Sequence, residues 1–196
     1  MTQGQSVASS PAKGKKMQGK TVLHILTGSI AAYKAGDLIK LMREHGARVI
    51  CVLTEGAKKF ITPLTIRAIS GEDVYDDFFT SKTPYDVLHT SLAEAADVIL
   101  VSPASANFIA RASIGLADDL GASILLATRC PVILAPAMND QMYTHPTTQR
   151  NIAVLKKIGY HFVDPIRGSL VCGKEAVGHI GDPEVIIDTL QNFVQK

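Results

Sequence analysis

The fold class is decided by the stretch TVLHILTGSIAAYKAGDLIKLMREHGARVICVLT, which occupies residues 21–54. An apolar, β-branched run at 21–27 is followed by a glycine, and apolar residues then recur at helical spacing over 30–46. Gly46 is a typical helix stop, and a second apolar run follows at 48–54. A strand, a helix and a second strand in this order predict a parallel β-α-β unit, because parallel strands need a crossover connection.

The same alternation continues along the chain. Further strands are expected at 97–102 and 131–136, a segment at 168–182 is expected to be a loop, and helices are expected at 63–70, 91–96, 107–115, 117–129, 144–159 and 183–196. Asp182 is expected to cap the last helix, with Pro183 at its first position. Apolar strands that alternate with helices predict an α/β fold, a single domain with a parallel sheet covered on both faces.

Composition places the chain among ordinary globular domains. It has 196 residues, of which 46% are hydrophobic and 19% charged. Residues 1–19 are polar and lack the apolar core of a secretory signal, so we expect a flexible tail there and one domain over 20–196. Residues 21–196 contain 16 basic and 18 acidic side chains, a net charge of −2. A slightly acidic domain argues against nucleic acid as a partner. No apolar run approaches the roughly 18 residues of a membrane span, so no membrane partner is expected.

The cysteines indicate a reducing compartment. Cys51, Cys130 and Cys172 are odd in number and far apart, and no CxxC pair exists. Neither a disulfide framework nor a zinc site is therefore indicated, the six histidines are scattered, and we expect a cytoplasmic protein without a metal. The apolar context of Cys51, and the position of Cys130 directly before a strand, assign both to packing.

The first strand runs directly into Gly28, Ser29 and Ile30, where a helix is expected to begin. Glycine lets a ligand approach the backbone, and a helix N-terminus offers free N–H groups and the positive end of a dipole. A phosphate or the edge of a flavin would suit this position. The dinucleotide fingerprint GxGxxG is absent, and the same residues also fit a plain strand-to-helix turn.

The other strand ends carry small or amide-bearing residues. The second strand ends at Thr54, the third leads into 102–107 (SPASAN), and the fourth leads into 136–139 (PAMN). Because ligands of parallel sheets bind beyond the carboxyl ends of the strands, these loops suit a planar heteroaromatic molecule, although each also fits an ordinary loop or cap. Asp118 and Asp119 are adjacent and would diverge on a helix, so a capping role is expected rather than a catalytic pair.

Longer segments of the sequence resemble the family of flavin-containing cysteine decarboxylases. The resemblance runs in order through GSIAAYKAGDLIKLMREHGARVICVLTEGAKKFITPLTIRAISG, HTSLAEAADVILVSPASANFIA, GLADDL, PAMNDQMYTHPTTQRNI and GSLVCG, and it covers nearly all of residues 20–190. Its most specific motifs are PASAN at 103–107 and PAMNDQM at 136–142, joined by His89 and the LVCG segment at 170–173.

The resemblance implies a Rossmann-like, flavodoxin-type sheet, bound FMN, and a homotrimer that some family members assemble into a homododecamer, with each flavin at a subunit boundary. The positions that would hold FMN are Gly28, Ser29, Ile30, Thr54, Ser105, Ala106, Asn107 and Ala137. The implied reaction is the decarboxylation of 4′-phosphopantothenoylcysteine to 4′-phosphopantetheine in coenzyme A biosynthesis.

The resemblance also assigns the chemistry to individual residues. Oxidation of the cysteine side chain to a thioaldehyde would make loss of CO₂ feasible, and the cofactor would supply that redox step. His89 would be the acid/base, although on local sequence it fits an ordinary residue at a helix start. Asn139 would bind the substrate carboxylate, Met142 would contact the substrate, and Cys172 would donate a proton late in the cycle.

Two departures from the family pattern concern the substrate side of the site. Tyr143 stands where the family often has Trp, and His179 with Ile180 replaces a common Arg-Met pair. Two alternatives remain open. One is a peptidyl-cysteine decarboxylase of a modified-peptide pathway, against which Cys172 argues because such enzymes need no reprotonation step. The other is a non-catalytic regulatory flavoprotein, against which the joint presence of His89, Asn139 and Cys172 argues.

Overall fold

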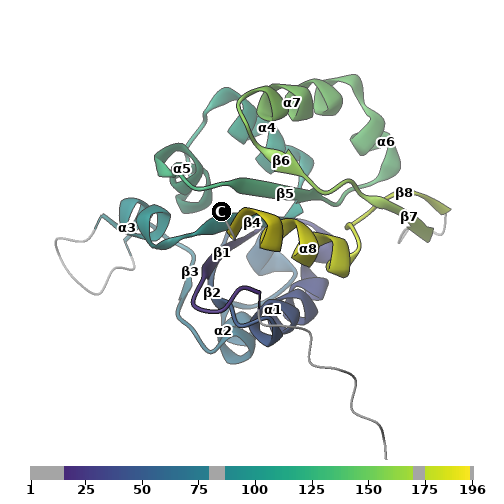
Figure 1. Ribbon diagram of the computed structural model, residues 1–196. Helices are drawn as coiled ribbons and strands as arrows, with labels where there is room; N and C mark the ends of the chain where they lie inside the picture. The colour runs from purple at the N-terminus through teal and green to yellow at the C-terminus, as the bar shows by residue number, and fades with distance from the viewer. Residues whose placement is uncertain (1–15, 80–86, 170–174, 195–196) are drawn as a thin grey trace, which may run out of the picture.

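The fold is described from a computed structural model, which describes residues 16–79, 87–169 and 175–194. Its centre is a six-stranded parallel sheet in the order β3-β2-β1-β4-β5-β6 (Figure 1). The strands are β1 (Thr21–Leu26), β2 (Arg48–Leu53), β3 (Val74–Tyr75), β4 (Val98–Ala104), β5 (Val132–Pro136) and β6 (His161–Phe162). The predicted parallel α/β sheet is confirmed. Its strand order, 3-2-1-4-5-6, is that of the Rossmann fold and differs from the flavodoxin order 2-1-3-4-5.

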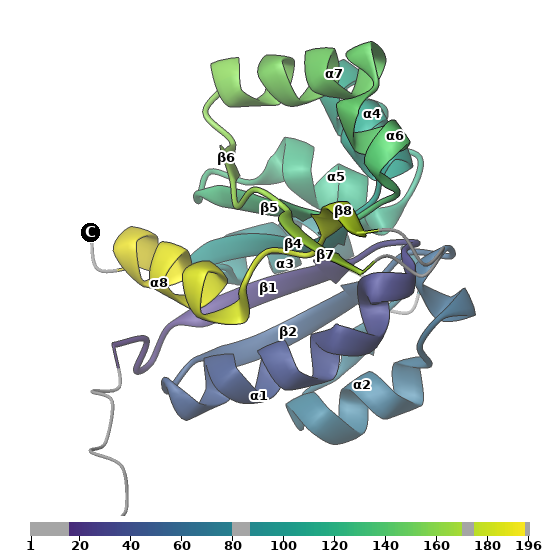
Figure 2. The ribbon, with the colours of Figure 1, turned by 90° about the vertical axis from the view of Figure 1, so that its right-hand side faces the viewer.

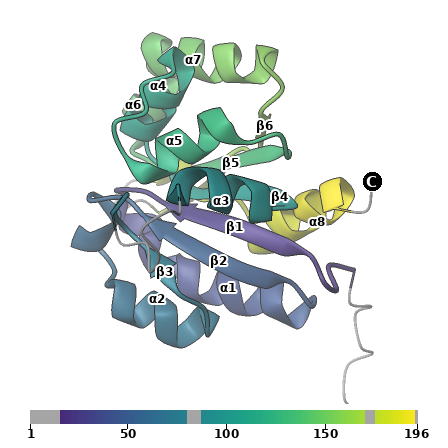
Figure 3. The ribbon, with the colours of Figure 1, turned by 90° about the vertical axis from the view of Figure 1, so that its left-hand side faces the viewer.

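Helices cover both faces of the sheet and divide the interior into two apolar cores. One face is packed by α1 (Ala35–Glu44), α2 (Pro63–Ser70) and α8 (Pro183–Val194) (Figure 2). The other face is packed by α3 (Leu88–Ala95), α4 (Ala106–Ile114), α5 (Leu120–Ala127) and α7 (Pro146–Lys157) (Figure 3). Successive strand residues point to opposite faces, so Val22 and Leu26 join the first core and Leu23 and Ile25 the second.

The central strands are mostly apolar because both of their faces are covered. All seven residues of β4 are buried, as are the last five of β1. The expected cap of the last helix is confirmed, since the Glu184 backbone N–H donates to Asp182 Oδ1 at 2.8 Å. Within the described residues, no helix is both long and apolar enough to cross a membrane.

The loop expected at 168–182 is wrong in part. Residues on either side of the undescribed segment pair as an antiparallel hairpin of β7 (Ile166–Ser169) and β8 (Glu175–His179). The glycines and mixed polarity of this segment hid the short strands, which pair only with each other and not with the main sheet. Figure 2 shows the hairpin beside the carboxyl ends of the central strands.

The expected end of the flexible tail at residue 19 is too late. Residues 1–15 lie outside the described part of the chain, but Met17 is fully buried and belongs to the first core, which also contains residues of α1 and α8. Its backbone N–H also donates to the carbonyl of His45 at 3.0 Å. The polar residues around Met17 concealed one apolar side chain that packs as part of the domain.

Candidate functional site

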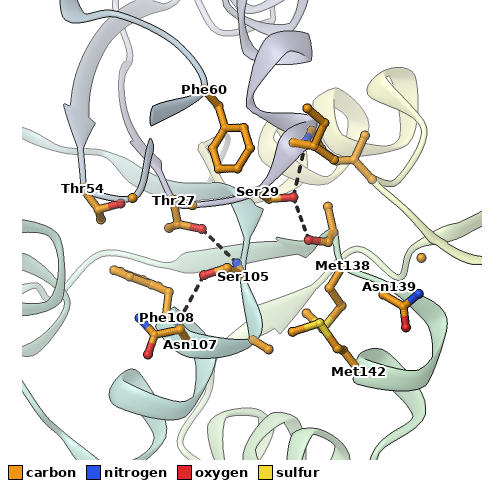
Figure 4. Close-up of a pocket in the computed structure, with 18 of the residues that line it drawn as sticks. Thr27, Ser29, Thr54, Phe60, Ser105, Asn107, Phe108, Met138, Asn139 and Met142 are labelled. Carbon is orange, nitrogen blue, oxygen red and sulfur yellow. Dashed lines mark hydrogen bonds between the residues drawn. The ribbon is translucent and has the colours of Figure 1, made fainter. Parts of the chain in front are cut away.

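A cavity of about 1010 Å³ opens beyond the carboxyl ends of β1, β2, β4 and β5 (Figure 4). Its lining includes every residue predicted to bind the cofactor or the substrate: Gly28, Ser29, Ile30, Thr54, Ser105, Ala106, Asn107, Ala137, Asn139 and Met142. Loops more than 100 residues apart in sequence thus meet at one end of the sheet, as the strand-end argument predicts.

The first wall of the cavity is formed where the loops after β1 and β2 touch. A Cβ placed on Gly28 would lie 3.1 Å from Gly56 Cα, and one placed on Gly56 would lie 3.0 Å from Gly28 Cα. Both contacts are with backbone, which cannot rotate aside. The two glycines therefore allow an approach of the loops that larger residues would prevent.

Ser29 ties the end of β1 to the end of β5. Its hydroxyl donates to the Ala137 carbonyl at 2.9 Å and accepts from the Ala31 backbone N–H at 3.3 Å. The second of these bonds caps the short 3₁₀ helix η1 (Ile30–Lys34), which continues into α1. The serine therefore fixes both the helix start and the loop that carries Asn139.

The segment after β4 is held by a side chain of the neighbouring strand end. Thr27 Oγ1 donates to the Pro103 carbonyl at 2.6 Å and accepts from the Ser105 backbone N–H at 2.9 Å. Ser105 then caps α4, its hydroxyl accepting from the Phe108 N–H at 3.3 Å. The N–H groups of Ala106 and Asn107 belong to the first helical turn, which has no intrahelical acceptors, so they can serve a ligand.

The loop after β2 contributes two side chains to the cavity wall, the buried hydroxyl of Thr54 and the partly exposed ring of Phe60. Thr54 is 9% exposed, and its Oγ1 accepts from the Ala57 N–H at 3.3 Å at the start of η2 (Ala57–Lys59). Phe60, one residue beyond η2, lines the cavity with 46% of its surface exposed. Figure 4 shows both side chains bordering the same space.

Asn139 and Met142 line the opposite side of the cavity. Asn139 caps the short helix α6 (Asp140–Thr144), with its Oδ1 accepting from the Gln141 N–H at 2.9 Å. This bond fixes the amide, so that its NH₂ group remains available to donate to an anion. Met142 is half exposed, and its thioether adds an adaptable apolar contact.

Arg111 pairs with the two adjacent aspartates. It forms ion pairs with Asp118, at 3.1 Å, and with Asp119. Asp119 also caps α5, accepting from the Ala122 N–H at 2.8 Å, which confirms the expected capping role for Asp119, whereas Asp118 pairs with Arg111. All three charged residues line the cavity, where one guanidinium between two carboxylates leaves the cluster with a formal charge of −1.

Of the two residues predicted to transfer protons, only His89 belongs to the described part of the chain. His89 lies in the first turn of α3, where its ring packs edge-on against Phe78 with 6.2 Å between centroids, and it does not line the cavity. Cys172 falls outside the described residues. Of the other cysteines, Cys51 is buried in the core, where desolvation raises its pKa to about 12, and Cys130 is half-buried, which confirms the packing role of both.

The hairpin closes one end of the cavity. The Met138 backbone N–H donates to the Gly178 carbonyl at 3.1 Å, which joins β8 to the loop that carries Asn139. His179 and Ile180 line the cavity. The ring of His179 lies so close to Gly168 that a Cβ there would stand 2.9 Å from it. The departure from the family pattern at these two positions therefore falls within the site.

Sequence reasoning missed several residues of the lining, among them Thr27, Gly56 and Phe60. Thr27 ends the first apolar run and could have been noticed as a polar residue at a strand end. Gly56 and Phe60 follow the second strand by only a few residues. The contact of Gly56 with Gly28, and that of the hairpin with Met138, join distant segments and left no local signal.

The lining as a whole fits a large planar ligand that carries an anionic tail. Small residues, backbone amides and hydroxyls predominate, and the apolar surface of Phe60, Met138 and Met142 can cover a ring. The glycine pair leaves room for close approach, and open N–H groups at the start of α4 can donate to oxygen or nitrogen acceptors.

Comparison with known proteins agrees with this geometry. A family model described as Flavoprotein matches residues 10–195. The chain is 44% identical over 181 residues to the coenzyme A biosynthesis bifunctional protein CoaBC of Haemophilus influenzae, covering 92% of this chain and 45% of that protein. It thus spans less than half the length of this curated relative.

Two solved structures share the fold over most of the chain. A mutant of PPC decarboxylase complexed with pantothenoylaminoethenethiol superposes with a TM-score of 0.82 at 31% identity, covering 90% of this chain and 99% of that one. The FMN binding protein AtHal3 superposes with a TM-score of 0.79 at 32% identity, covering 90% and 97%.

Proposed function

The chain belongs to the flavoprotein family, and from this premise we propose that it binds FMN and decarboxylates 4′-phosphopantothenoylcysteine to 4′-phosphopantetheine in coenzyme A biosynthesis. The observation that carries the proposal is the cavity at the strand ends, where the predicted flavin positions and the substrate residues Asn139 and Met142 share one lining. The identity to CoaBC and the likeness to PPC decarboxylase support this substrate. The proposed enzyme is a cytoplasmic carboxy-lyase with a small-molecule substrate.

The loops at the strand ends would hold the cofactor. Gly28, Ser29, Ile30 and Thr54 would bind it from the β1–β2 side, and Ser105, Ala106, Asn107 and Ala137 from the β4–β5 side. Backbone N–H groups and hydroxyls suit both the phosphate and the polar edge of a flavin. When bound, FMN supplies an acceptor for a hydride equivalent from the cysteine side chain and returns it later, so the overall reaction has no net redox change.

Asn139 would orient the substrate carboxylate. Its Oδ1 is occupied by the Gln141 N–H, which directs the NH₂ group as the donor toward an anion. An uncharged donor binds the carboxylate without the strong stabilisation that a cation would give to a charge that must be lost as CO₂. Met142, 50% exposed beside it, would pack against the apolar part of the substrate.

Cys172 would provide the last proton. An ordinary thiol titrates near pH 8.5 and is therefore mostly protonated at neutral pH, which suits a proton donor. Protonation of the enethiolate that decarboxylation leaves separates the coenzyme A branch from enzymes that release an enethiol. The sequence context of Cys172, in LVCG at 170–173, supports this role.

His89 would act across a subunit boundary. Within one chain its ring packs against Phe78 and does not line the cavity, so a partner's copy would have to complete the site. This arrangement agrees with a homotrimer, or a dodecamer of trimers, as the working assembly. Light scattering of the flavin-bound protein should give a multiple of three subunits, and a stable monomer or dimer would contradict it.

A complementation experiment tests the shared site. His89→Asn and Asn139→Asp are each expected to be inactive. When both chains are co-expressed and purified as mixed assemblies, some sites receive an intact His89 from one chain and an intact Asn139 from the other. Activity should therefore reappear. Continued inactivity of verified mixed assemblies would place both residues of each site on the same chain.

The reaction is tested by incubating the purified protein with 4′-phosphopantothenoylcysteine and following the products by mass spectrometry. Loss of CO₂ to give 4′-phosphopantetheine is the expected result. Turnover of a peptide with a C-terminal cysteine, but not of this substrate, would favour the peptidyl-cysteine alternative. FMN binding without either reaction would favour the regulatory flavoprotein.

A further inference from the structure

The pairing of β4 with its neighbours becomes irregular just before the cavity. The last β4 residue paired with β1 is Val101, opposite Ile25, and the pairing with β5 is interrupted between Val101 and Ala104. The carbonyl groups of Ser102 and Pro103 lie within this irregular segment. Two buried side chains, both from β1 or its immediate end, bond to them.

His24 holds the first of these carbonyls. Its Nε2 lies 2.7 Å from the Ser102 carbonyl oxygen, which can only accept, so Nε2 carries the proton. The side chain is fully buried, and desolvation lowers its pKa to about 4, so the ring is neutral at physiological pH. Its Nδ1 has no hydrogen-bond partner among the described residues, and neither has the Ser102 hydroxyl.

Thr27 holds the second carbonyl and the start of the following helix. Its hydroxyl is buried, donates to Pro103 O at 2.6 Å and accepts from Ser105 N at 2.9 Å. One side chain thereby fixes the path of the chain on both sides of Ala104. A buried hydroxyl that donates and accepts in this way constrains position more tightly than apolar packing, because both bonds are directional.

A purely apolar strand would avoid the cost of these polar groups. The neighbours Leu23, Ile25 and Leu26 are fully buried without any polar side-chain atom to satisfy. A buried polar atom without a partner is destabilising, and His24 Nδ1 is such an atom among the described residues. The two polar residues, His24 and Thr27, lie beside the end of β4, the strand that leads into the cavity lining at Ser105.

We propose that Thr27, supported by His24, is a positioning residue that sets where the first turn of α4 presents its backbone N–H groups to the flavin. The proposal rests on the proposed function, because it assumes that FMN occupies the cavity. The path of action is short: Thr27 fixes Ser105, and Ser105 caps the helix in which Ala106 and Asn107 form the first turn. A small displacement at Ser105 moves both N–H groups together.

The test compares Thr27→Val with Thr27→Ser. Valine keeps the shape of threonine but leaves Pro103 O and Ser105 N–H unpaired, whereas serine keeps the hydroxyl. Apo-protein prepared from each full-length variant is titrated with FMN, and quenching of flavin fluorescence gives the dissociation constant. We expect an increase of about tenfold or more for Thr27→Val, close to one lost hydrogen bond in binding free energy, and recovery to near the wild-type value for Thr27→Ser.

The matched control is Thr128→Val, which also removes a threonine hydroxyl bonded to a backbone N–H, that of Cys130 at 3.2 Å, away from the cavity. It should lower the melting temperature of the apo-protein without changing FMN affinity. His24→Leu, which removes only the bond to Ser102, should weaken FMN binding less than Thr27→Val. If Thr27→Val does not accumulate as folded protein, Thr27→Cys replaces it in the comparison. Because a thiol is a weak donor, we expect its FMN dissociation constant to lie between those of the wild type and Thr27→Val.

The outcomes distinguish failure of the proposed function from failure of the positioning role of Thr27. If the wild-type protein binds no FMN, the proposed function itself fails. If the wild type binds FMN and Thr27→Val, or Thr27→Cys in its place, binds it with unchanged affinity and unchanged flavin absorption, the positioning role is overturned while the proposed function stands. A fall in melting temperature alone, with FMN affinity intact, would assign the hydroxyl to stability only.

Discussion

Gly28 and Gly56 are in backbone contact, so that a Cβ on either residue would lie 3.0–3.1 Å from the Cα of the other. One glycine follows β1 and the other follows β2, and both line the cavity. The separation of these two strand ends is therefore set by the absence of side chains. Any atom added between the loops must widen the cavity wall.

Gly56→Ala is expected to weaken FMN binding by about tenfold, because the new Cβ forces the two loops apart at a cost of roughly 1–3 kcal/mol. Fluorescence titration of the apo-protein measures the change. Gly36→Ala is the control, since its Cβ would meet only the movable end of the Ile69 side chain, at 3.0 Å, in a helix away from the cavity. Unchanged FMN affinity in Gly56→Ala would show that the loops can separate without consequence.

Met17→Ala should destabilise the protein by about 2–5 kcal/mol, because it leaves a cavity where a fully buried side chain packs against the core. Urea unfolding followed by circular dichroism measures the free energy of unfolding. Lys16→Ala, which changes an exposed neighbour, should have little effect. A loss below about 0.5 kcal/mol for Met17→Ala would indicate that this residue contributes nothing to the domain.

The stability of the protein should fall with acidification in a window set by His24. Its folded pKa of about 4 lies below the ordinary value of 6.5, so the unfolded chain binds a proton that the folded chain excludes. This contribution to stability is complete above pH 6.5, declines as the pH falls toward 4, and amounts to about 3 kcal/mol in all. Urea unfolding between pH 4 and 7 should show a shallower pH dependence for His24→Gln, and parallel curves for the two proteins would refute the assignment.

Asn139→Asp should abolish turnover while FMN stays bound. The new carboxylate would face the substrate carboxylate, so a donor is lost and like charges repel each other. The measurement is anaerobic mixing with 4′-phosphopantothenoylcysteine, followed by flavin absorbance and CO₂ release together. We expect neither signal to change. Normal turnover would mean that another residue binds the substrate carboxylate.

Cys172→Ser should arrest the reaction at a later stage than Asn139→Asp. The serine hydroxyl is a far weaker acid than a thiol, so the final protonation should fail after one equivalent of CO₂ has been released. Mass spectrometry should then detect an enethiol-type product in place of 4′-phosphopantetheine. Wild-type turnover would show that the thiol is not the donor, and absence of CO₂ would place its action earlier in the cycle.

The parts of the fold that depend on neighbouring residues could be predicted from sequence. The apolar runs and the cap at Asp182 predicted the sheet and its covering helices, and the residues at the strand ends predicted nine positions of the cavity lining, while Met142 came only from the family resemblance. These features arise because a buried strand, a cap or a tight turn restricts residue types locally. Ser29 and Asn139 were found in this way, since both follow strands directly.

The parts that depend on distant contacts could not be predicted. The hydroxyl of Thr27 bonds to a carbonyl 76 positions away, and nothing near Thr27 in the sequence indicates that partner. Met17 was assigned to a tail because its neighbours are polar, although its side chain is buried. His89 was expected beside the other site residues and packs elsewhere within the single chain, because sequence order carries no information about which residues a second subunit would supply.

The pairing of β1 with β4 also has a consequence for biosynthesis. The ribosome makes β1, α1 and β2 well before β4, so β1 waits with one edge unpaired until the second half of the sheet has emerged. The cavity draws its walls from both halves and from the hairpin near the end of the chain, so no early fragment can recognise the ligand. A complete ligand site therefore exists only after β4, β5 and the hairpin have folded onto the first half of the sheet.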